Sequence, residues 1–200
     1  MSQSLEGYWH SLIERPMVRQ AVSLFVLAVD GNIPGNLALD ASTSIHSKET
    51  AVTAAALTLA LELPADRSQA IAAGSLLHDI GKSSCLDLVT DDDPIDPSDT
   101  ESLDRLRRHP LVGKQIVELV YDSPEWAEPV AYIWGHHSHK RKDGNNFPTR
   151  EDFYASWVKS EIGVQEYNWL LHYGPIVAYA DVFNVLLHPS RRGYLMRRLA

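Results

Sequence analysis

Residues 76–82 read LLHDIGK, in which a histidine and an aspartate directly follow two leucines. Gly74 lies one turn before His78 on the same face of the predicted helix, so a neighbouring helix can approach closely there. We expect Gly81 to end this helix. His78 and Asp79 then lie at the buried end of an apolar helix. Burying an ionised carboxylate there costs several kcal/mol unless a partner of opposite charge compensates.

The composition is that of a folded globular protein with one domain. The chain has 200 residues, of which 44% are hydrophobic and 22% charged. Its net charge of -8 disfavours nonspecific binding to nucleic acids, which requires a basic surface. Cys85 is the one cysteine, so the chain cannot form an internal disulfide, and we expect a reducing, cytoplasmic location.

The longest uncharged apolar run covers residues 21–29, about half the length of a membrane-spanning helix. Arg15 and Arg19 precede it, as in a signal peptide, but no clear cleavage pattern of small residues follows. We interpret the run as part of the core and expect no membrane association.

Helical spacing dominates the chain, and strand-like alternation is nearly absent. The expected helices share apolar positions three and four residues apart and are bounded by capping or proline signals. They are residues 47–63 before Pro64, 66–81 with an Asp66–Gln69 capping box, 98–109 with a Ser98–Glu101 capping box, a helix starting at Pro110, one starting at Ser123 and Pro124, and residues 167–187. We expect loops at residues 91–99 and 140–148, which are rich in turn-forming residues. The fold class is therefore all-α.

Imidazoles and carboxylates recur at the buried faces or ends of these helices, where lysine and arginine are almost absent. A divalent cation can compensate the buried carboxylates, and this mixture of ligands suits iron, manganese, zinc or nickel. The candidate metal ligands are His46, His78, Asp79, His109, His136, His137 and Asp181.

Five segments occur in an order that resembles the HD-domain metal-dependent phosphohydrolases, and among them the HD-GYP type. They are IHSKETAVTAAALTLALEL, AGSLLHDIGK, RRHPLVGKQIVE, GHHSHKRKDGNNFP and YADVFNVL, and the likeness covers about residues 36–188. The resemblance implies a helical bundle with two divalent ions in its core, bridged by Asp79. It also implies that His46, His78 and Asp181 complete one site, that His109, His136 and His137 complete the other, and that a hydroxide between the ions is the nucleophile. Iron or manganese is favoured, and zinc, nickel or magnesium is compatible.

The segment after the paired histidines departs from the HD-GYP pattern. HD-GYP proteins have HHE and GYP, whereas this chain has Ser138 after the histidine pair and NFP at residues 146–148. A second alignment makes His139 a ligand in this segment. We favour His136 and His137, because His137 lies on the predicted inward face. Some members have an additional acidic ligand four residues before the first histidine, which enlarges the site to three ions. Ser42 stands at that position here, so we expect two ions.

Three basic residues are candidates for binding a substrate phosphate. Lys82 directly follows Gly81 and is near enough to Asp79 in the chain to reach a phosphate oxygen bound there. The resemblance implies this role in catalysis. Lys114 and Arg141 are weaker candidates.

The sequence therefore predicts a cytoplasmic metal-dependent phosphohydrolase that acts on a small phosphate-containing nucleotide, with cyclic di-GMP as the substrate that HD-GYP resemblance implies. Residues 1–35 are expected to form a helical cap or extension, and residues 36–200 the HD domain. One alternative is a catalytically degenerate signalling or binding module, since the glutamate after the histidine pair is missing. The other is an HD nuclease for single-stranded DNA, which the net charge of -8 disfavours.

Overall fold

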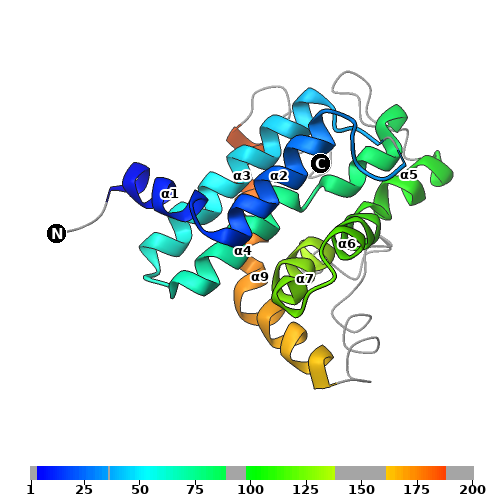
Figure 1. Ribbon diagram of the computed structural model, residues 1–200. Coiled ribbons are helices and arrows are strands. Elements are labelled where there is room, and N and C mark those ends of the chain that lie inside the picture. The colour runs from blue at the N-terminus through cyan, green and yellow to red at the C-terminus, as the bar shows by residue number, and fades with distance from the viewer. Residues whose placement is uncertain (1–3, 36, 89–97, 138–160, 188–200) are drawn as a thin grey trace.

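The computed structural model describes residues 4–35, 37–88, 98–137 and 161–187, and these residues form an all-α bundle, as predicted (Figure 1). Strand-type pairing within them is limited to one isolated bridge between Ile33 and Leu37. The helices in chain order are α1 (Leu5–Ile13), α2 (Pro16–Val29), α3 (Ala41–Ala60), α4 (Ala65–Leu77), η1 (Ile80–Leu88), α5 (Thr100–Arg107), α6 (His109–Val120), η2 (Pro124–Trp126), α7 (Ala127–Gly135) and α9 (Glu161–Leu187).

Helix α4 is the centre of the bundle. It packs against α2, α3, α7 and α9, and every residue from 70 to 80 is buried. Ala70, Ala72, Ala73 and Gly74 are small, so four neighbouring helices can approach its axis. A helix that is apolar on all sides is stable in water only when it is enclosed in this way. The stretch LLHDIGK therefore begins inside the core.

Helices α1 and α2 pack on the same bundle. The apolar run at residues 21–29 contributes one face to the core, because Ala21, Leu24 and Phe25 belong to the same cluster of buried side chains as Leu76 and Leu77. Helix α2, in blue in Figure 1, packs against α4. The interpretation of this run as core is confirmed for that face.

Three predicted helix starts were wrong by a few residues. Helix α3 begins at Ala41 instead of residue 47, because Asp40 caps it by accepting a hydrogen bond from the Thr43 amide at 2.9 Å. Consequently His46 lies in the second turn of α3. Helix α4 begins before Asp66, with Pro64 in the cap position. Asp99, instead of its neighbour Ser98, caps α5.

Gly81 does not end the helix before it. Helix α4 ends at Leu77, and Gly81 lies inside the 3-10 helix η1. A Cβ at Gly81 would lie 2.0 Å from the His109 carbonyl oxygen and 2.6 Å from the Gly113 nitrogen. Glycine is required here because two backbones meet, and this contact holds η1 against the start of α6.

The later helices follow the prediction more closely. Pro110 lies in the first turn of α6, and Ser123 caps η2, which continues into α7. Helix α9 contains the predicted residues 167–187. Its segment Asn168–Leu187 is long and apolar enough to cross a membrane, which is weak evidence on its own. Helix α9 packs against α3, α4 and α7, so part of this segment contributes to the core of the bundle.

Candidate metal centre

The structure brings all seven predicted metal ligands together in the interior of the bundle. Most of them lie where helices end or begin, because the bundle turns its chain there. His78 caps α4 and His136 caps α7, each followed by a second candidate, while His109 is the first residue of α6. The other two, His46 and Asp181, come from within α3 and α9. All seven candidate ligands are at most 9% exposed: His46, His78, Asp79, His109, His136, His137 and Asp181.

Asp79 lies between two groups of imidazoles and presents one carboxylate oxygen to each. Its Oδ2 lies 3.3 Å from His78 Nε2 and 3.9 Å from His46 Nε2. Its Oδ1 lies 3.2 Å from His109 Nε2 and 3.8 Å from His136 Nε2. A carboxylate in this position can coordinate two neighbouring cations, one through each oxygen.

The first group, which we call the mixed half-site, consists of His46, His78, Asp79 and Asp181. The ligand atoms of His46, His78 and Asp79 all lie within 4.8 Å of one another. Asp181 Oδ1 lies 3.0 Å from His46 Nε2 and 3.8 Å from His78 Nε2. This half-site therefore offers two imidazole nitrogens and two carboxylate groups.

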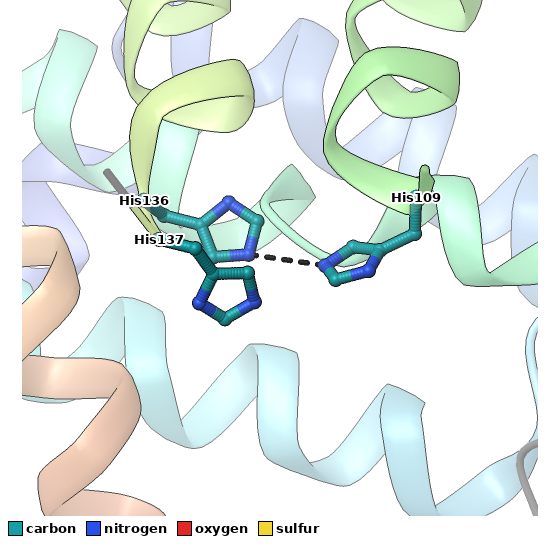
Figure 2. Close-up of side chains that lie close together, drawn as sticks. All are labelled: His109, His136 and His137. Carbon is teal, nitrogen blue, oxygen red and sulfur yellow. Dashed lines mark hydrogen bonds between the residues drawn. The ribbon is translucent and has the colours of Figure 1, made fainter. Parts of the chain in front are cut away.

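The second group, which we call the three-histidine half-site, consists of His109, His136 and His137. Figure 2 shows His136 and His137, from the end of α7, pointing toward His109 at the start of α6. Their ligand atoms lie within 4.8 Å of one another, and the His109 and His136 Nε2 atoms are 3.2 Å apart. With Asp79 Oδ1, this half-site offers three nitrogens and one oxygen.

Backbone carbonyls fix the ring orientation of three of these histidines. Nδ1 donates a hydrogen bond to the carbonyl three residues earlier in His78 (2.8 Å), His109 (2.7 Å) and His136 (2.7 Å). A carbonyl oxygen only accepts, so Nδ1 must carry the proton. In a neutral ring, Nε2 then presents a bare lone pair toward Asp79, as in metal-binding histidines whose other nitrogen is held by an outer partner.

The donor set fits divalent cations. Neutral His109 and His136 point two lone pairs at each other across 3.2 Å, an arrangement that is repulsive unless a cation or a proton lies between them. The Nε2 atom of His78 is buried without a hydrogen-bond partner and faces two carboxylates. Imidazole and carboxylate donors suit iron, manganese, zinc and nickel.

The pKa values follow from burial and from these contacts. Burial holds the pKa of His136 well below its usual range, and the nearby His78 and His109 lower it further. For Asp79, burial acts to raise the pKa, but His78 and Lys82 outweigh it and hold the pKa well below the usual range. Asp79 is therefore ionised and His136 neutral near neutral pH, which are the forms that bind metal. For His78, burial acts to lower the pKa, but Asp79 outweighs it and raises the pKa, so His78 must lose a proton before its Nε2 can bind metal.

The candidate phosphate-binding residues differ in position. Lys82 Nζ lies 2.6 Å from Asp79 Oδ2, so its ammonium group is at the edge of the ligand cluster. Lys114 lies further along α6, where it pairs with Glu118 and covers the Trp134 ring at 5.6 Å. Arg141 lies outside the described residues. Ser138, the alternative ligand His139, and the segment NFP at 146–148 also lie outside them.

Sequence reasoning missed a buried polar contact between α3 and α9. The amide nitrogen of Asn184 donates to Thr53 Oγ1 at 3.1 Å and to the Ala180 carbonyl at 2.8 Å. Asn184 lies one turn after Asp181 in the apolar C-terminal half of α9, a spacing that was visible in the sequence. The contact holds the Asp181 turn of α9 against α3, which carries His46.

A second missed network joins α4, α7 and α9. Glu128 is 8% exposed, accepts a hydrogen bond from the Tyr132 hydroxyl at 2.6 Å and pairs with the Arg67 guanidinium. Arg67 also lies 5.4 Å from the Trp169 ring centroid and 5.6 Å from that of Tyr173. Burial raises the pKa of Glu128. Nothing in the sequence periodicity marked these partners, because they come from three separate helices.

Comparison with known proteins gives one match. Residues 43–185 match the family model described as the HD domain, and this range contains all seven candidate ligands. A search of curated proteins and a search of solved structures each gave no match to the chain.

Proposed function

Because this chain belongs to the HD-domain family, a family of metal-dependent phosphohydrolases, we propose that it hydrolyses a phosphoester or phosphodiester bond of a nucleotide. The observation that carries the proposal is the position of Asp79, whose two carboxylate oxygens face two different groups of imidazoles. Such an arrangement suits two neighbouring cations, and two-metal sites are typical of phosphoester hydrolysis.

The mixed half-site would hold one divalent ion and the three-histidine half-site the other, with Asp79 shared. When bound, such ions lower the pKa of a water molecule and polarise a phosphate oxygen. The described histidines contribute no charge in their neutral form, so two divalent ions would outweigh the charges of Asp79 and Asp181. A locally positive site can then attract an anionic substrate to a chain whose net charge is -8.

The residues of the chain would prepare this site in three ways. The backbone carbonyls hold the Nδ1 protons of His78, His109 and His136, so each Nε2 stays available. Burial of the ligands excludes bulk water and strengthens their interaction with cations. Lys82 holds its ammonium group beside Asp79, where it can bind a phosphate oxygen.

The substrate is proposed from the same features. We propose a small nucleotide, with cyclic di-GMP as the first to be tested, in a cytoplasmic protein whose HD domain covers residues 36–200 and whose residues 1–35 act as a helical cap. The five ordered segments that resemble HD-GYP proteins support cyclic di-GMP, while Ser138 and NFP at 146–148 make other nucleotides worth testing beside it.

Purification without metal-affinity steps, followed by elemental analysis, tests the metal content. The protein reconstituted with Mn²⁺ or Fe²⁺ is then assayed with a chromogenic phosphodiester, cyclic di-GMP, its linear product and a panel of nucleotides. We expect hydrolysis by the wild type and none by Asp79→Asn. We expect Lys82→Ala to lower kcat/KM about tenfold to a hundredfold, which is the range for losing one charge-assisted hydrogen bond.

Lys114→Ala is the comparison for Lys82→Ala, because Lys114, the weaker phosphate-binding candidate, is a half-buried lysine that pairs with Glu118 instead of Asp79. It should change kcat/KM much less. A metal-loaded protein that hydrolyses none of these compounds would reject the proposed activity and favour a signalling or binding module. Hydrolysis of nucleotides but not of cyclic di-GMP would reject only the specific substrate.

A further inference from the structure

The ring of His46 is held differently from the rings of His78, His109 and His136. Its Nε2 lies 3.0 Å from Asp181 Oδ1, but its buried Nδ1 has no hydrogen-bond partner among the described residues. His46 lies inside α3, and its ring directs Nε2 to a carboxylate on α9, so no carbonyl of its own helix holds its Nδ1. His46 therefore lacks the backbone contact that fixes those three rings.

Three hydroxyl groups on α3 and α4 are also buried and have no hydrogen-bond partner among the described residues. Ser47 and Thr50 on α3 and Ser75 on α4 are each 0% exposed. Other hydroxyls on the same two helices behave differently. Ser44 donates to the Asp40 carbonyl at 2.8 Å, and Ser68 donates to the Pro64 carbonyl at 3.1 Å. The three partnerless hydroxyls are thus unusual within their own helices, and each carries a desolvation cost of roughly 1–3 kcal/mol unless something binds it.

The register of the two helices brings these hydroxyls to one place. Helices α3 and α4 follow each other along the chain and run antiparallel, and His46 lies opposite Asp79, with 3.9 Å between Nε2 and Oδ2. Four residues further along α3 is Thr50, and four residues before Asp79 in the chain is Ser75 on α4, so the register predicts that these two lie at about the same level, one turn deeper. Helical side chains lean toward the N-terminus of their own helix, which carries the Thr50 hydroxyl toward the His46 turn and the Ser75 hydroxyl deeper into the seam.

We propose that a water molecule binds in the seam between α3 and α4, held by the hydroxyls of Thr50 and Ser75, and hydrogen-bonds Nδ1 of His46. Ser47 lies at the edge of the same seam and supplies a further hydroxyl. Buried waters typically make about three hydrogen bonds to polar groups that otherwise lack partners, and these groups provide that number. The water is an outer partner that positions His46 as a ligand, as the carbonyls do for the other rings.

Water suits this position because it can reverse its hydrogen bond. Without metal, His46 Nε2 donates to the Asp181 carboxylate, so a neutral ring has a bare Nδ1 that needs a donor. As a metal ligand through Nε2, the ring instead carries its proton on Nδ1 and needs an acceptor. A carbonyl could serve only the second form, whereas water bound to two hydroxyls can serve both.

The first test is a high-resolution crystal structure of the wild-type protein. We expect one ordered water within hydrogen-bonding distance of Thr50 Oγ1, Ser75 Oγ and His46 Nδ1. A dry seam, or hydroxyls rotated onto their own helix carbonyls, overturns the proposal. This test needs neither bound metal nor hydrolytic activity, so its result is independent of the proposed function.

The second test measures metal binding by calorimetric titration with Mn²⁺. Thr50→Val and Ser75→Ala should weaken the mixed half-site by about tenfold to a hundredfold, the usual effect of losing an outer partner of a ligand, and leave the three-histidine half-site unchanged. Ser68→Ala is the matched control, because it removes a hydroxyl that is equally buried on α4 but bonded to a carbonyl. It should leave both affinities unchanged. Equal affinities in all three variants would show that the water does not position His46.

Discussion

The substitution Gly81→Ala tests whether the contact between η1 and α6 sets the geometry of the metal centre. The new Cβ would lie 2.0 Å from the His109 carbonyl oxygen, whereas ordinary contacts begin at 3.4 Å. The two backbones must therefore separate by about 1.4 Å, the difference between these distances. His109 is itself a candidate ligand, and its Nε2 lies 3.2 Å from Asp79 Oδ1.

This displacement is large compared with what a metal site tolerates. Ligand distances in such sites vary by roughly 0.2 Å, so a movement of over 1 Å should remove His109 from the three-histidine half-site. The mixed half-site does not use α6 and should keep its ion. We therefore expect Gly81→Ala to bind about one ion per chain where the wild type binds about two. Elemental analysis after reconstitution and dialysis measures this ratio directly.

The same substitution should lower stability. Inserting a methyl group into a packed contact costs about 1–3 kcal/mol, and the upper end applies here because the neighbouring atoms are backbone. For a chain of this size, about 3 kcal/mol corresponds to a Tm lower by roughly 6–12 °C. Circular dichroism of the metal-free protein provides the measurement.

Two other glycines serve as controls. A Cβ at Gly113 would meet Ile133 Cγ2 at 3.0 Å and the Gly81 nitrogen at 3.4 Å, so Gly113→Ala should have a milder effect of the same kind. A Cβ at Gly174 on α9 would meet only the side chain of Leu170 at 2.7 Å, which can rotate away. Gly174→Ala should therefore keep both ions. A folded Gly81→Ala protein with two ions at wild-type affinity would refute the argument.

Three further predictions follow from buried polar groups. Asp79→Asn should remove both ions by elemental analysis, and it should also change the acid stability of the metal-free protein. The folded-state pKa of Asp79 lies well below 3.8, so its ionised form stabilises the wild type above the unfolded pKa, and urea titrations between about pH 5 and pH 3 should show a loss that Asp79→Asn lacks. Asn184→Leu should cost about 0.5–1.5 kcal/mol in urea unfolding, because the part-buried hydrogen bond between Asn184 and Thr53 is lost, and a neutral result would contradict this role. Glu128→Leu should destabilise the protein more than Glu128→Gln, since only the glutamine still offers an oxygen to Arg67, and equal losses would show that the contact is not stabilising.

Most of the site could be predicted because its ligands obey helical spacing. His78 follows an apolar helix on its inward face, and Asp181 shares a face with Val177 and Ala178, both of which are buried. Burying an imidazole or carboxylate at such a position is unfavourable unless the group binds a partner. A bound cation can therefore be inferred without knowledge of the tertiary contacts. The sequence could therefore name the candidate ligands before it could place them.

Helix starts and tertiary contacts were harder to predict, for two physical reasons. Adjacent residues such as Ser98 and Asp99 can both cap a helix. Their capping free energies differ so little that tertiary packing decides which of them is the cap. Gly81 has the local appearance of a helix stop, but its purpose is the approach of a second backbone 28 positions away at His109. Single-helix periodicity contains no information about such a neighbour.

The location of the histidines at helix ends has a common physical cause. The last carbonyls of a helix have no amide partner within it, so they can accept a proton from a histidine that follows. His78 and His136 use the carbonyls of Ser75 and Ile133 in this way, and each ring is oriented by the helix that precedes it. His46 lies inside a helix and directs Nε2 to a carboxylate on another helix, so its Nδ1 needs a partner from a neighbouring helix or from solvent. The hydroxyls of Thr50 and Ser75, which have no hydrogen-bond partner among the described residues, lie on the helix that carries His46 and on the helix that precedes Asp79, where such a partner for His46 is needed.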